Sequence, residues 1–162
     1  MNSNNIRIRA EVIAGDVSAI ERIVLSTGFF RPDEIKVAVE LVEERLEKGL
    51  ESGYEFVFAE VGDEVAAYAC FGLIPCSLIS YDLYWIATNK KFQNMGLGKL
   101  LLEKAEAIVR INGGKAIYIE TSSKPIYNPT REFYFRNGYQ LKARFEDFYD
   151  IGDDKLLFCK KV

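Results

Sequence analysis

The chain contains no histidine among its 162 residues, which excludes several kinds of catalytic site at once. Neither a Ser-His-Asp triad nor a Cys-His pair can be built, and metal sites that use imidazole are excluded as well. The three cysteines, Cys70, Cys76 and Cys159, show no CxxC spacing, so we expect neither a disulfide framework nor a metal site. Any proton transfer must therefore use Asp, Glu, Tyr, Lys, Cys or water.

Long apolar runs and a basic charge balance are also missing. No stretch approaches the ~20 apolar residues that span a bilayer, and residues 1–6 are polar, without the apolar region of a signal peptide. A net charge of −3 argues against binding to nucleic acid. With 49% apolar residues, the chain predicts one compact cytoplasmic domain, residues 1–162, with neither a membrane nor a nucleic acid as partner.

Asp and Glu are absent from Leu83 to Leu102, although the chain has 24 acidic residues. The segment QNMGLGK, residues 93–99, lies in this region, between an apolar strand and an amphipathic helix. A helix start usually favours Asp or Glu, because its free N–H groups make that end positive. Two glycines and a lysine at this place indicate that an external anion is bound. The segment therefore predicts a phosphate-binding loop.

Two other interpretations of this loop are open. Gly96 and Gly98 could form half of a dinucleotide-binding fingerprint, with Glu120 as the ribose-binding acid, although Leu101 occupies the place of the third glycine. The glycines could also serve only to close a tight turn. The absence of acids and the presence of Gln93 favour the phosphate site.

Periodicity along the chain predicts the element order β-α-α-β-β-β-α-β-α-β-β. The expected strands are residues 6–12, 55–61, 64–73, 79–88, 115–121, 141–149 and 155–161, and the expected helices are residues 16–27, 33–52, 96–112 and 129–136. Asp16 is expected to cap the first helix, and residues 152–154 to form the last hairpin turn. Acids gather over residues 40–64 and 146–154, which we interpret as solvated surface in preference to a rim that attracts a cationic substrate. This order predicts an α/β fold, a mixed sheet with helices on both faces.

Two separated motifs resemble those of the GNAT superfamily of acyl-CoA-dependent N-acyltransferases. The family's pyrophosphate motif, Gln/Arg-x-x-Gly-x-Gly/Ala, is matched by QNMGLG at residues 93–98. The strand before it, DLYWIAT at residues 82–88, stands where the family opens a strand to clamp pantetheine. The family's short helix, aromatic-Tyr-x-x-x-Gly-aromatic, is matched by FYFRNGY at residues 133–139. The resemblance covers most of the chain and implies the GNAT fold, a central, mostly antiparallel mixed sheet flanked by helices.

The resemblance implies an N-acetyltransferase that moves the acetyl group of acetyl-CoA to a primary amine by direct attack in a ternary complex, without a metal. A strand bulge near residues 86–88 is expected to offer an N–H group to the carbonyl oxygen. Lys90 and Lys91 are further candidates to neutralise phosphates. The family's asparagine position is taken by Tyr127, with Asn128 beside it. The implied donor-binding residues are Trp85, Ile86, Ala87, Thr88, Gln93, Asn94, Met95, Gly96, Leu97, Gly98, Lys99, Asn128 and Arg131.

Two residues are the first candidates for proton transfer. Tyr134 resembles the family tyrosine that donates a proton to the departing CoA sulfur, a contribution of ~10²–10⁴ to the rate. An aromatic side chain that only packs under the sheet is the alternative for Tyr134. Asp82 is the leading candidate for general base, because some lysine-acetylating members carry a glutamate at the matching place. A strand residue that only bonds to backbone is the alternative for Asp82, and Glu120 or a water chain is the alternative base.

The acceptor amine is not identified by the sequence. By resemblance, residues 27–33 and 147–154 wall its pocket. Core packing or hairpin closure explains the same residues equally well. The candidates to line the pocket are Phe29, Phe30, Phe148 and Tyr149, and those to hold a cation are Asp150, Asp153 and Asp154. A non-catalytic module that senses CoA or a nucleotide and a small nucleotide-binding oxidoreductase are the alternative functions. Exposed edge strands at the last hairpin are compatible with a homodimer.

Overall fold

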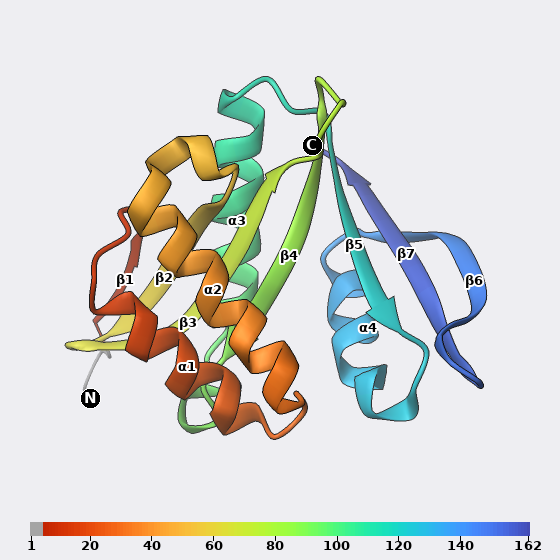
Figure 1. Ribbon diagram of the computed structural model, residues 1–162, viewed down its shortest axis with the longest axis horizontal. Coiled ribbons are helices and arrows are strands. Elements are labelled where there is room, and N and C mark those ends of the chain that lie inside the picture. Colours follow the sequence, from red (N-terminus) through yellow and green to blue (C-terminus); the bar gives the residue numbers. More distant parts are fainter. Residues whose placement is uncertain (1–4) are drawn as a thin grey trace.

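The computed structural model describes residues 5–162, so the expected polar start at residues 1–4 lies outside the described part. Within it, seven strands form one sheet in the order β1-β2-β3-β4-β5-β7-β6 (Figure 1). The strands are β1 (Ile6–Arg9), β2 (Glu55–Val61), β3 (Glu64–Leu73), β4 (Ser80–Thr88), β5 (Ala116–Ser122), β6 (Gln140–Asp150) and β7 (Asp153–Lys161). The helices are α1 (Asp16–Thr27), α2 (Pro32–Lys48), α3 (Leu97–Ile111) and α4 (Asn128–Arg136), with 3₁₀ turns η1 (Gly49–Ser52), η2 (Lys90–Phe92) and η3 (Pro125–Tyr127). The predicted element order is confirmed.

The sheet opens at its centre. Neighbouring strands pair antiparallel except β4 and β5, which run parallel because α3 carries the chain back to the end of the sheet where β4 began. This parallel pair comprises only Ser80↔Ala116, Tyr81↔Ile117 and Asp82↔Tyr118. Beyond Asp82 the two strands diverge, while β5 stays paired with β7 along its length (Figure 1). The sheet therefore has two halves joined at one end.

Two hydrophobic clusters attach the helices to opposite faces of the sheet. On one face, α3 buries Leu101 and Val109 among the residues of β2, β3 and β4. On the other face, α1 and α2 bury Ile20 and Val42 together with Phe58 and other residues of β2 and β3. The split follows from the strands, because successive side chains point to opposite faces. Among residues 5–162, no helix combines the length and the apolar content that crossing a bilayer requires.

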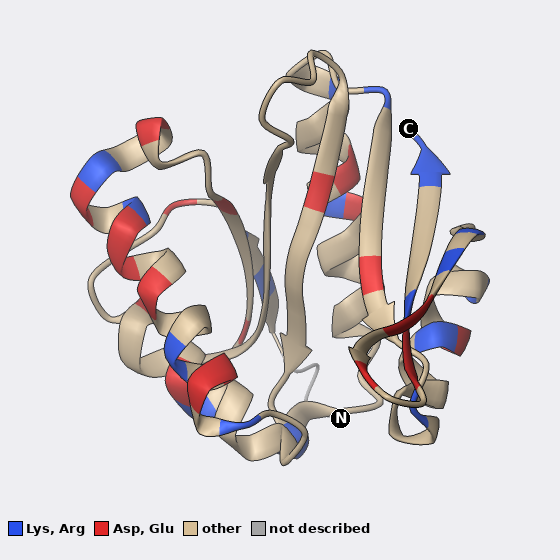
Figure 2. Cartoon of the chain, turned by 45° about the vertical axis from the view of Figure 1, so that its right-hand side comes forward, with Lys and Arg blue, Asp and Glu red and all other residues tan. Residues whose placement is uncertain are grey.

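Four of the nine acids of the first acidic stretch lie on α2 (Figure 2). Three of them, Glu40, Glu43 and Glu47, are exposed, as the interpretation of a solvated helix face predicts. Glu60 departs from it, because it is buried and accepts hydrogen bonds from Arg7 and Arg9. A charged row on the free side of an amphipathic helix therefore explains the part of this stretch that lies in α2.

Several predicted boundaries were wrong. The first strand ends at Arg9, and η1 replaces the last turn of the predicted second helix. Asp16 does not cap α1: Gly15 holds the cap position, and the buried Asp16 carboxylate pairs with Arg9 at 2.5 Å. An ion pair with a neighbouring strand cannot be seen in the local signal for a helix start. The last turn lies at residues 151–152, and Asp153 and Asp154 already belong to β7.

Candidate active site

The opening of the sheet begins just before a bulge in β4. Leu83 pairs with Phe71 and Trp85 pairs with Cys70, so Tyr84 is the extra residue of the bulge. The bulge expected near residues 86–88 is therefore present in β4, but two residues earlier, at Tyr84. A bulge bends its strand and increases its twist, so it belongs where β4 turns away from β5.

Residues Trp85, Ile86, Ala87 and Thr88 continue along β4 beyond the bulge. Ile86, Ala87 and Thr88 pair with β3, and within residues 5–162 the opposite backbone edge of this segment has no strand partner. The predicted donor clamp thus lies on a backbone edge that is free to bind an extended ligand.

The glycine segment forms the start of α3, as the phosphate-binding interpretation requires. Asn94 and Gly96 have φ values of 65° and 75°, so the chain turns sharply before the helix begins. No acid lies in the first turn, and no side chain caps it. Within residues 5–162, the backbone N–H groups of Leu97, Gly98 and Lys99 have no acceptor, whereas Leu100 donates to Gly96 at 3.3 Å. Three N–H groups and the positive end of the helix dipole are available to an anion.

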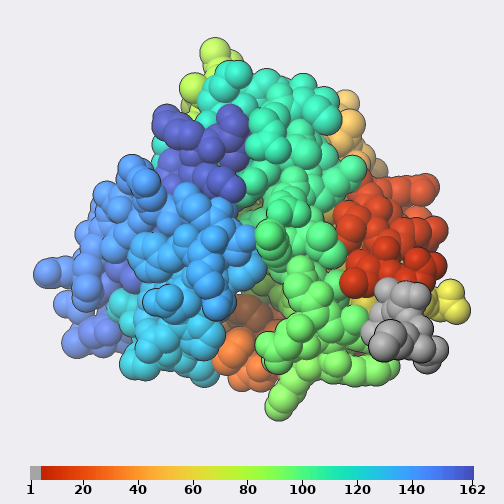
Figure 3. All heavy atoms as spheres, turned by 180° about the vertical axis from the view of Figure 1, so that it is seen from behind, coloured from red at the N-terminus to blue at the C-terminus, as the bar shows by residue number. Residues whose placement is uncertain are grey.

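Gly98 brings this helix start against α4. A Cβ atom at Gly98 would lie 3.0 Å from Cζ of Phe133, closer than side chains normally pack. A furrow is visible on this face between the green surface around α3 and the blue surface of α4 (Figure 3). Gly98 therefore allows close approach between α3 and α4, and a larger residue would push them apart.

Three of the four cations expected near the phosphates have protein partners. Lys91 pairs with Glu64 at 2.8 Å, and Lys99 lies 3.8 Å from Glu103 on an exposed side of α3. Arg131 donates to the carbonyl oxygens of Ser122 and Lys124 at 2.6 and 3.1 Å, and also to the Asn128 side chain. These contacts hold the loop between β5 and α4 in place. Within residues 5–162, Lys90 alone of these cations has no side-chain partner, so the N–H groups of α3 and the Lys90 ammonium are available to an anion.

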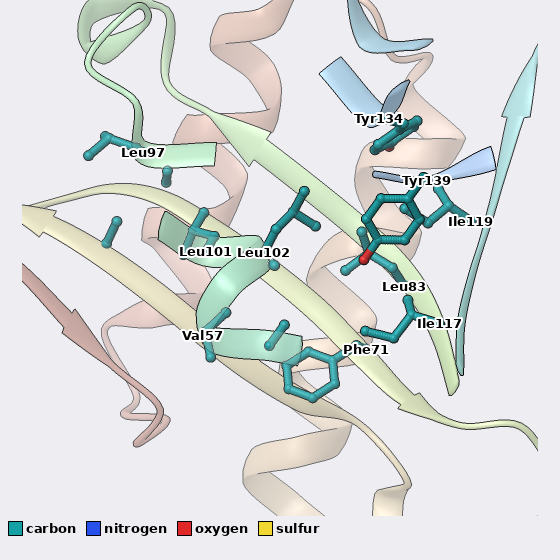
Figure 4. Packing of buried hydrophobic residues seen from close by; sticks show 14 of the residues in the cluster. Val57, Phe71, Leu83, Leu97, Leu101, Leu102, Ile117, Ile119, Tyr134 and Tyr139 are labelled. Atoms are coloured by element: carbon teal, nitrogen blue, oxygen red, sulfur yellow. The ribbon is translucent and has the colours of Figure 1, made fainter. Parts of the chain in front are cut away.

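Tyr134 lies in α4, and its side chain belongs to the hydrophobic cluster that also contains the buried residues of α3. Its side chain is 5% exposed, and its ring centroid lies 6.1 Å from that of Tyr139 and 5.7 Å from that of Phe158 (Figure 4). Burial raises the pKa of the Tyr134 hydroxyl above its ordinary value, with a smaller contribution from Tyr127. The phenol is therefore a hydrogen donor throughout the neutral pH range.

Asp82 lies at the last pair before the opening, on the face opposite Tyr134. Its neighbours in β4, Tyr81 and Leu83, belong to the cluster under α3, so alternation directs Asp82 to the face of α1 and α2. Burial and then the charge of Glu120 raise the pKa of Asp82 to about 6, against a lowering by Lys155. A carboxyl with this pKa is a base at neutral pH and is poised to accept a proton.

Lys155 was missed by the sequence reasoning. Its Nζ lies 3.0 Å from Glu120 and 4.2 Å from the ring centroid of Phe148. It stands opposite Ser122 in the pairing of β5 with β7, which brings it beside Glu120. No motif marks this lysine, and only the register of two distant strands places it near Asp82.

The residues expected to line the acceptor pocket have mixed roles. Phe29, Phe148 and Tyr149 are exposed, whereas Phe30 packs against Trp85 with ring centroids 4.8 Å apart. The predicted cation partners are mostly engaged within the protein. Asp153 accepts from Ser122 and lies 3.5 Å from Lys124, Asp154 pairs with Arg144 at 2.5 Å, and Asp150 accepts from the N–H of Ile151. Asp82, by contrast, forms no side-chain hydrogen bond and no ion pair within residues 5–162.

Solved structures share this fold along nearly the whole chain. A protein assigned to the GNAT acetyltransferases, from Desulfovibrio desulfuricans, is 43% identical, with 97% of this chain and 99% of that chain covered and a TM-score of 0.95. The PaiA N-acetyltransferase of Thermoplasma acidophilum, in complex with coenzyme A, is 16% identical over 98% and 99% of the two chains, with a TM-score of 0.73. The ribosomal-protein-S18-alanine N-acetyltransferase of Escherichia coli is 17% identical, with 98% of this chain and 94% of that chain covered and a TM-score of 0.77. No curated protein matches the chain.

The class of protein follows from the comparisons: it is an acetyltransferase. The acetyltransferase (GNAT) family model matches residues 18–139. The chain belongs to the GNAT acetyltransferase family, and it is an acyltransferase. This membership removes the dinucleotide-binding interpretation of Gly96 and Gly98.

Proposed function

We propose that the protein transfers the acetyl group of acetyl-CoA to a primary amine by direct attack in a ternary complex. One observation carries the proposal: β4 and β5 part directly after Asp82, and Asp82 and Tyr134 belong to opposite faces of the sheet at this opening. A donor entering from the α3 side and an amine entering from the α1 side can meet there. GNAT-fold structures in complex with coenzyme A support the choice of donor.

The residues of the chain can supply each step of this transfer. The N–H groups of Leu97, Gly98 and Lys99 bind the diphosphate of the donor, and the free edge of β4 beyond the bulge holds its pantetheine arm. An N–H group of that edge stabilises the carbonyl oxygen as negative charge develops on it. The remaining donor contacts, from Gln93 to Met95, Asn128 and Arg131, stay predictions of the family resemblance.

An alkyl amine with a pKa of ~10 arrives as ammonium at neutral pH, so its nitrogen loses two protons on the way to the amide. Asp82 accepts the first, directly or through water, which frees the lone pair that bonds to the acetyl carbon. The carbon–sulfur bond then breaks, and Tyr134 donates its phenolic hydrogen to the leaving sulfur. The second proton of the nitrogen restores the phenol through water, and the proton on Asp82 passes to solvent.

The first test is binding and turnover. Calorimetry with acetyl-CoA and CoA measures the donor site, and a panel of polyamines, amino acids, peptides and aminoglycosides, read by released thiol, finds the acceptor. An aminoglycoside 6'-N-acetyltransferase in complex with coenzyme A shares this fold with the ribosomal-protein-S18-alanine N-acetyltransferase, so the fold leaves the amine open. No binding at millimolar CoA would contradict the proposal. Binding without thiol release for any amine would favour the non-catalytic sensing module instead.

The second test concerns Tyr134. Tyr134→Phe should lower turnover ~10²-fold and change CoA affinity less than twofold, because only the phenolic hydrogen is removed. Tyr68→Phe is the matched control, since Tyr68 is fully buried and its hydroxyl lacks a hydrogen-bond partner within the described residues. Equal turnover in Tyr134→Phe and wild type would remove the acid role.

Two further predictions concern the whole protein. We expect it to act in the cytoplasm. We also expect it to form a homodimer through the edge strand β6, which sedimentation can measure.

A further inference from the structure

A buried carboxylate on α3 bonds to residues from the other half of the sheet. Glu106 is 5% exposed, and its Oε1 accepts a hydrogen bond from the Tyr139 hydroxyl at 3.1 Å. Lys160 Nζ donates to both carboxylate oxygens, at 2.9 and 3.0 Å. Because a buried charge is costly unless it is paired and hydrogen-bonded, both partners are needed to keep Glu106 in this position.

These bonds join elements that the sheet itself leaves apart. The main contacts of α3 with strands fall on β1 to β4, which form one half of the opened sheet. Tyr139 follows α4 and Lys160 lies in β7, both in the other half. Glu106 therefore connects the halves on the side of the sheet that carries α3 and α4.

Tyr139 is in turn attached directly to Tyr134. Its backbone N–H donates to the carbonyl oxygen of Tyr134 at 3.0 Å, and the two rings lie side by side (Figure 4). A second contact between α3 and α4 lies at Gly98 and Phe133. Gly98 and Glu106 are about two helical turns apart on α3. Tyr134 is thus held between two fixed points on the helix whose start binds the donor.

We propose that Glu106, acting through Tyr139, is a positioning residue that fixes Tyr134 relative to the donor site at the start of α3. The inference rests on the proposed acid role of Tyr134. A phenylalanine at position 139 would fill the same apolar space, so what the hydroxyl adds is the hydrogen bond to Glu106. This bond fixes the position of the Tyr139 ring relative to α3. It thereby sets the distance between the phenol of Tyr134 and the sulfur of a donor bound at α3.

The test is a double-mutant cycle with Tyr134→Phe, using acetyl-CoA and any amine that the wild type acetylates. Tyr139→Phe should lower kcat at least fivefold, with the KM for acetyl-CoA and the Kd for CoA within twofold of wild type. In the Tyr134→Phe background, Tyr139→Phe should lower kcat less than twofold, because there is no phenol left to position. Effects that multiply in the double variant, or no loss of kcat in Tyr139→Phe, would overturn the inference. In either case the acid role of Tyr134 would stand.

A second pair of variants separates positioning from packing. Glu106→Gln keeps an oxygen acceptor for Tyr139, so its kcat should stay within threefold of wild type, whereas Glu106→Met should match the loss in Tyr139→Phe. Equal kcat in the two Glu106 variants would overturn the inference, and this pair decides the matter if Tyr139→Phe does not fold. Tyr68→Phe is again the control and should leave kcat unchanged. If Tyr134→Phe itself has full activity, the proposed acid role and this inference both fail.

Discussion

Asp82 makes the pH dependence of turnover a direct test of the site. Its pKa is raised to about 6, first by burial and then by the charge of Glu120. The carboxylate form is therefore about 90% of the protein at pH 7 and about 10% at pH 5. If Asp82 accepts the proton of a bound ammonium group, kcat/KM should fall about tenfold between these two values.

The alkaline side of the same profile distinguishes this mechanism from one without a base. An acceptor with a pKa of ~10 that binds as ammonium gives a plateau of kcat/KM from about pH 6 to about pH 10. An acceptor that must bind as the free amine gives a tenfold rise for each pH unit up to its pKa instead. Released thiol, measured at constant ionic strength, records either shape. A steady rise through pH 7 to 9 would refute the base role.

Two variants assign the acid side of the profile to its residue. Asp82→Asn should abolish the fall near pH 6, and a fall that persists there would refute the assignment. Lys155→Met should move the fall to higher pH, because the Lys155 ammonium lowers the pKa of Asp82.

The Asp82 carboxyl also affects the stability of the folded protein, which can be measured without any substrate. Since folding raises its pKa, its stabilising contribution is complete below about pH 4 and is lost as pH rises through about 6. Asp82→Asn should therefore increase the free energy of unfolding at pH 8 but not at pH 4.

Two further predictions follow from packing and charge. Gly98→Ala should weaken CoA binding about tenfold by calorimetry, because its Cβ would lie 3.0 Å from Phe133. Gly15→Ala is the control and should leave the affinity unchanged, because nothing lies within 4 Å of its Cβ. Equal affinities in the two variants would contradict the close approach of α3 and α4. Asp16→Asn should lower the free energy of unfolding in urea by about 2 kcal/mol, because Arg9 loses one of its two buried carboxylate partners and keeps Glu60. A loss as small as that of the exposed Glu21→Gln would contradict it.

The sequence by itself determined the local parts of this protein. The acid-free segment with Gly96 and Gly98 predicted a helix start with free N–H groups, and α3 begins there with no acid in its first turn. Periodicity predicted the order of all strands and helices, and the FYFRNGY pattern indicated the helix that carries Tyr134. These signals succeed because caps, turns and amphipathic faces depend on residues only a few positions apart.

The tertiary structure decided everything that depends on register. The last β4–β5 pair at Asp82, the bulge at Tyr84 and the approach of Lys155 to Glu120 all follow from how distant strands align. The burial of Asp16 and the bond between Glu106 and Tyr139 likewise join residues whose own neighbours give no sign of the contact. Register is set by the summed packing of both sheet faces, so no single stretch of sequence contains it.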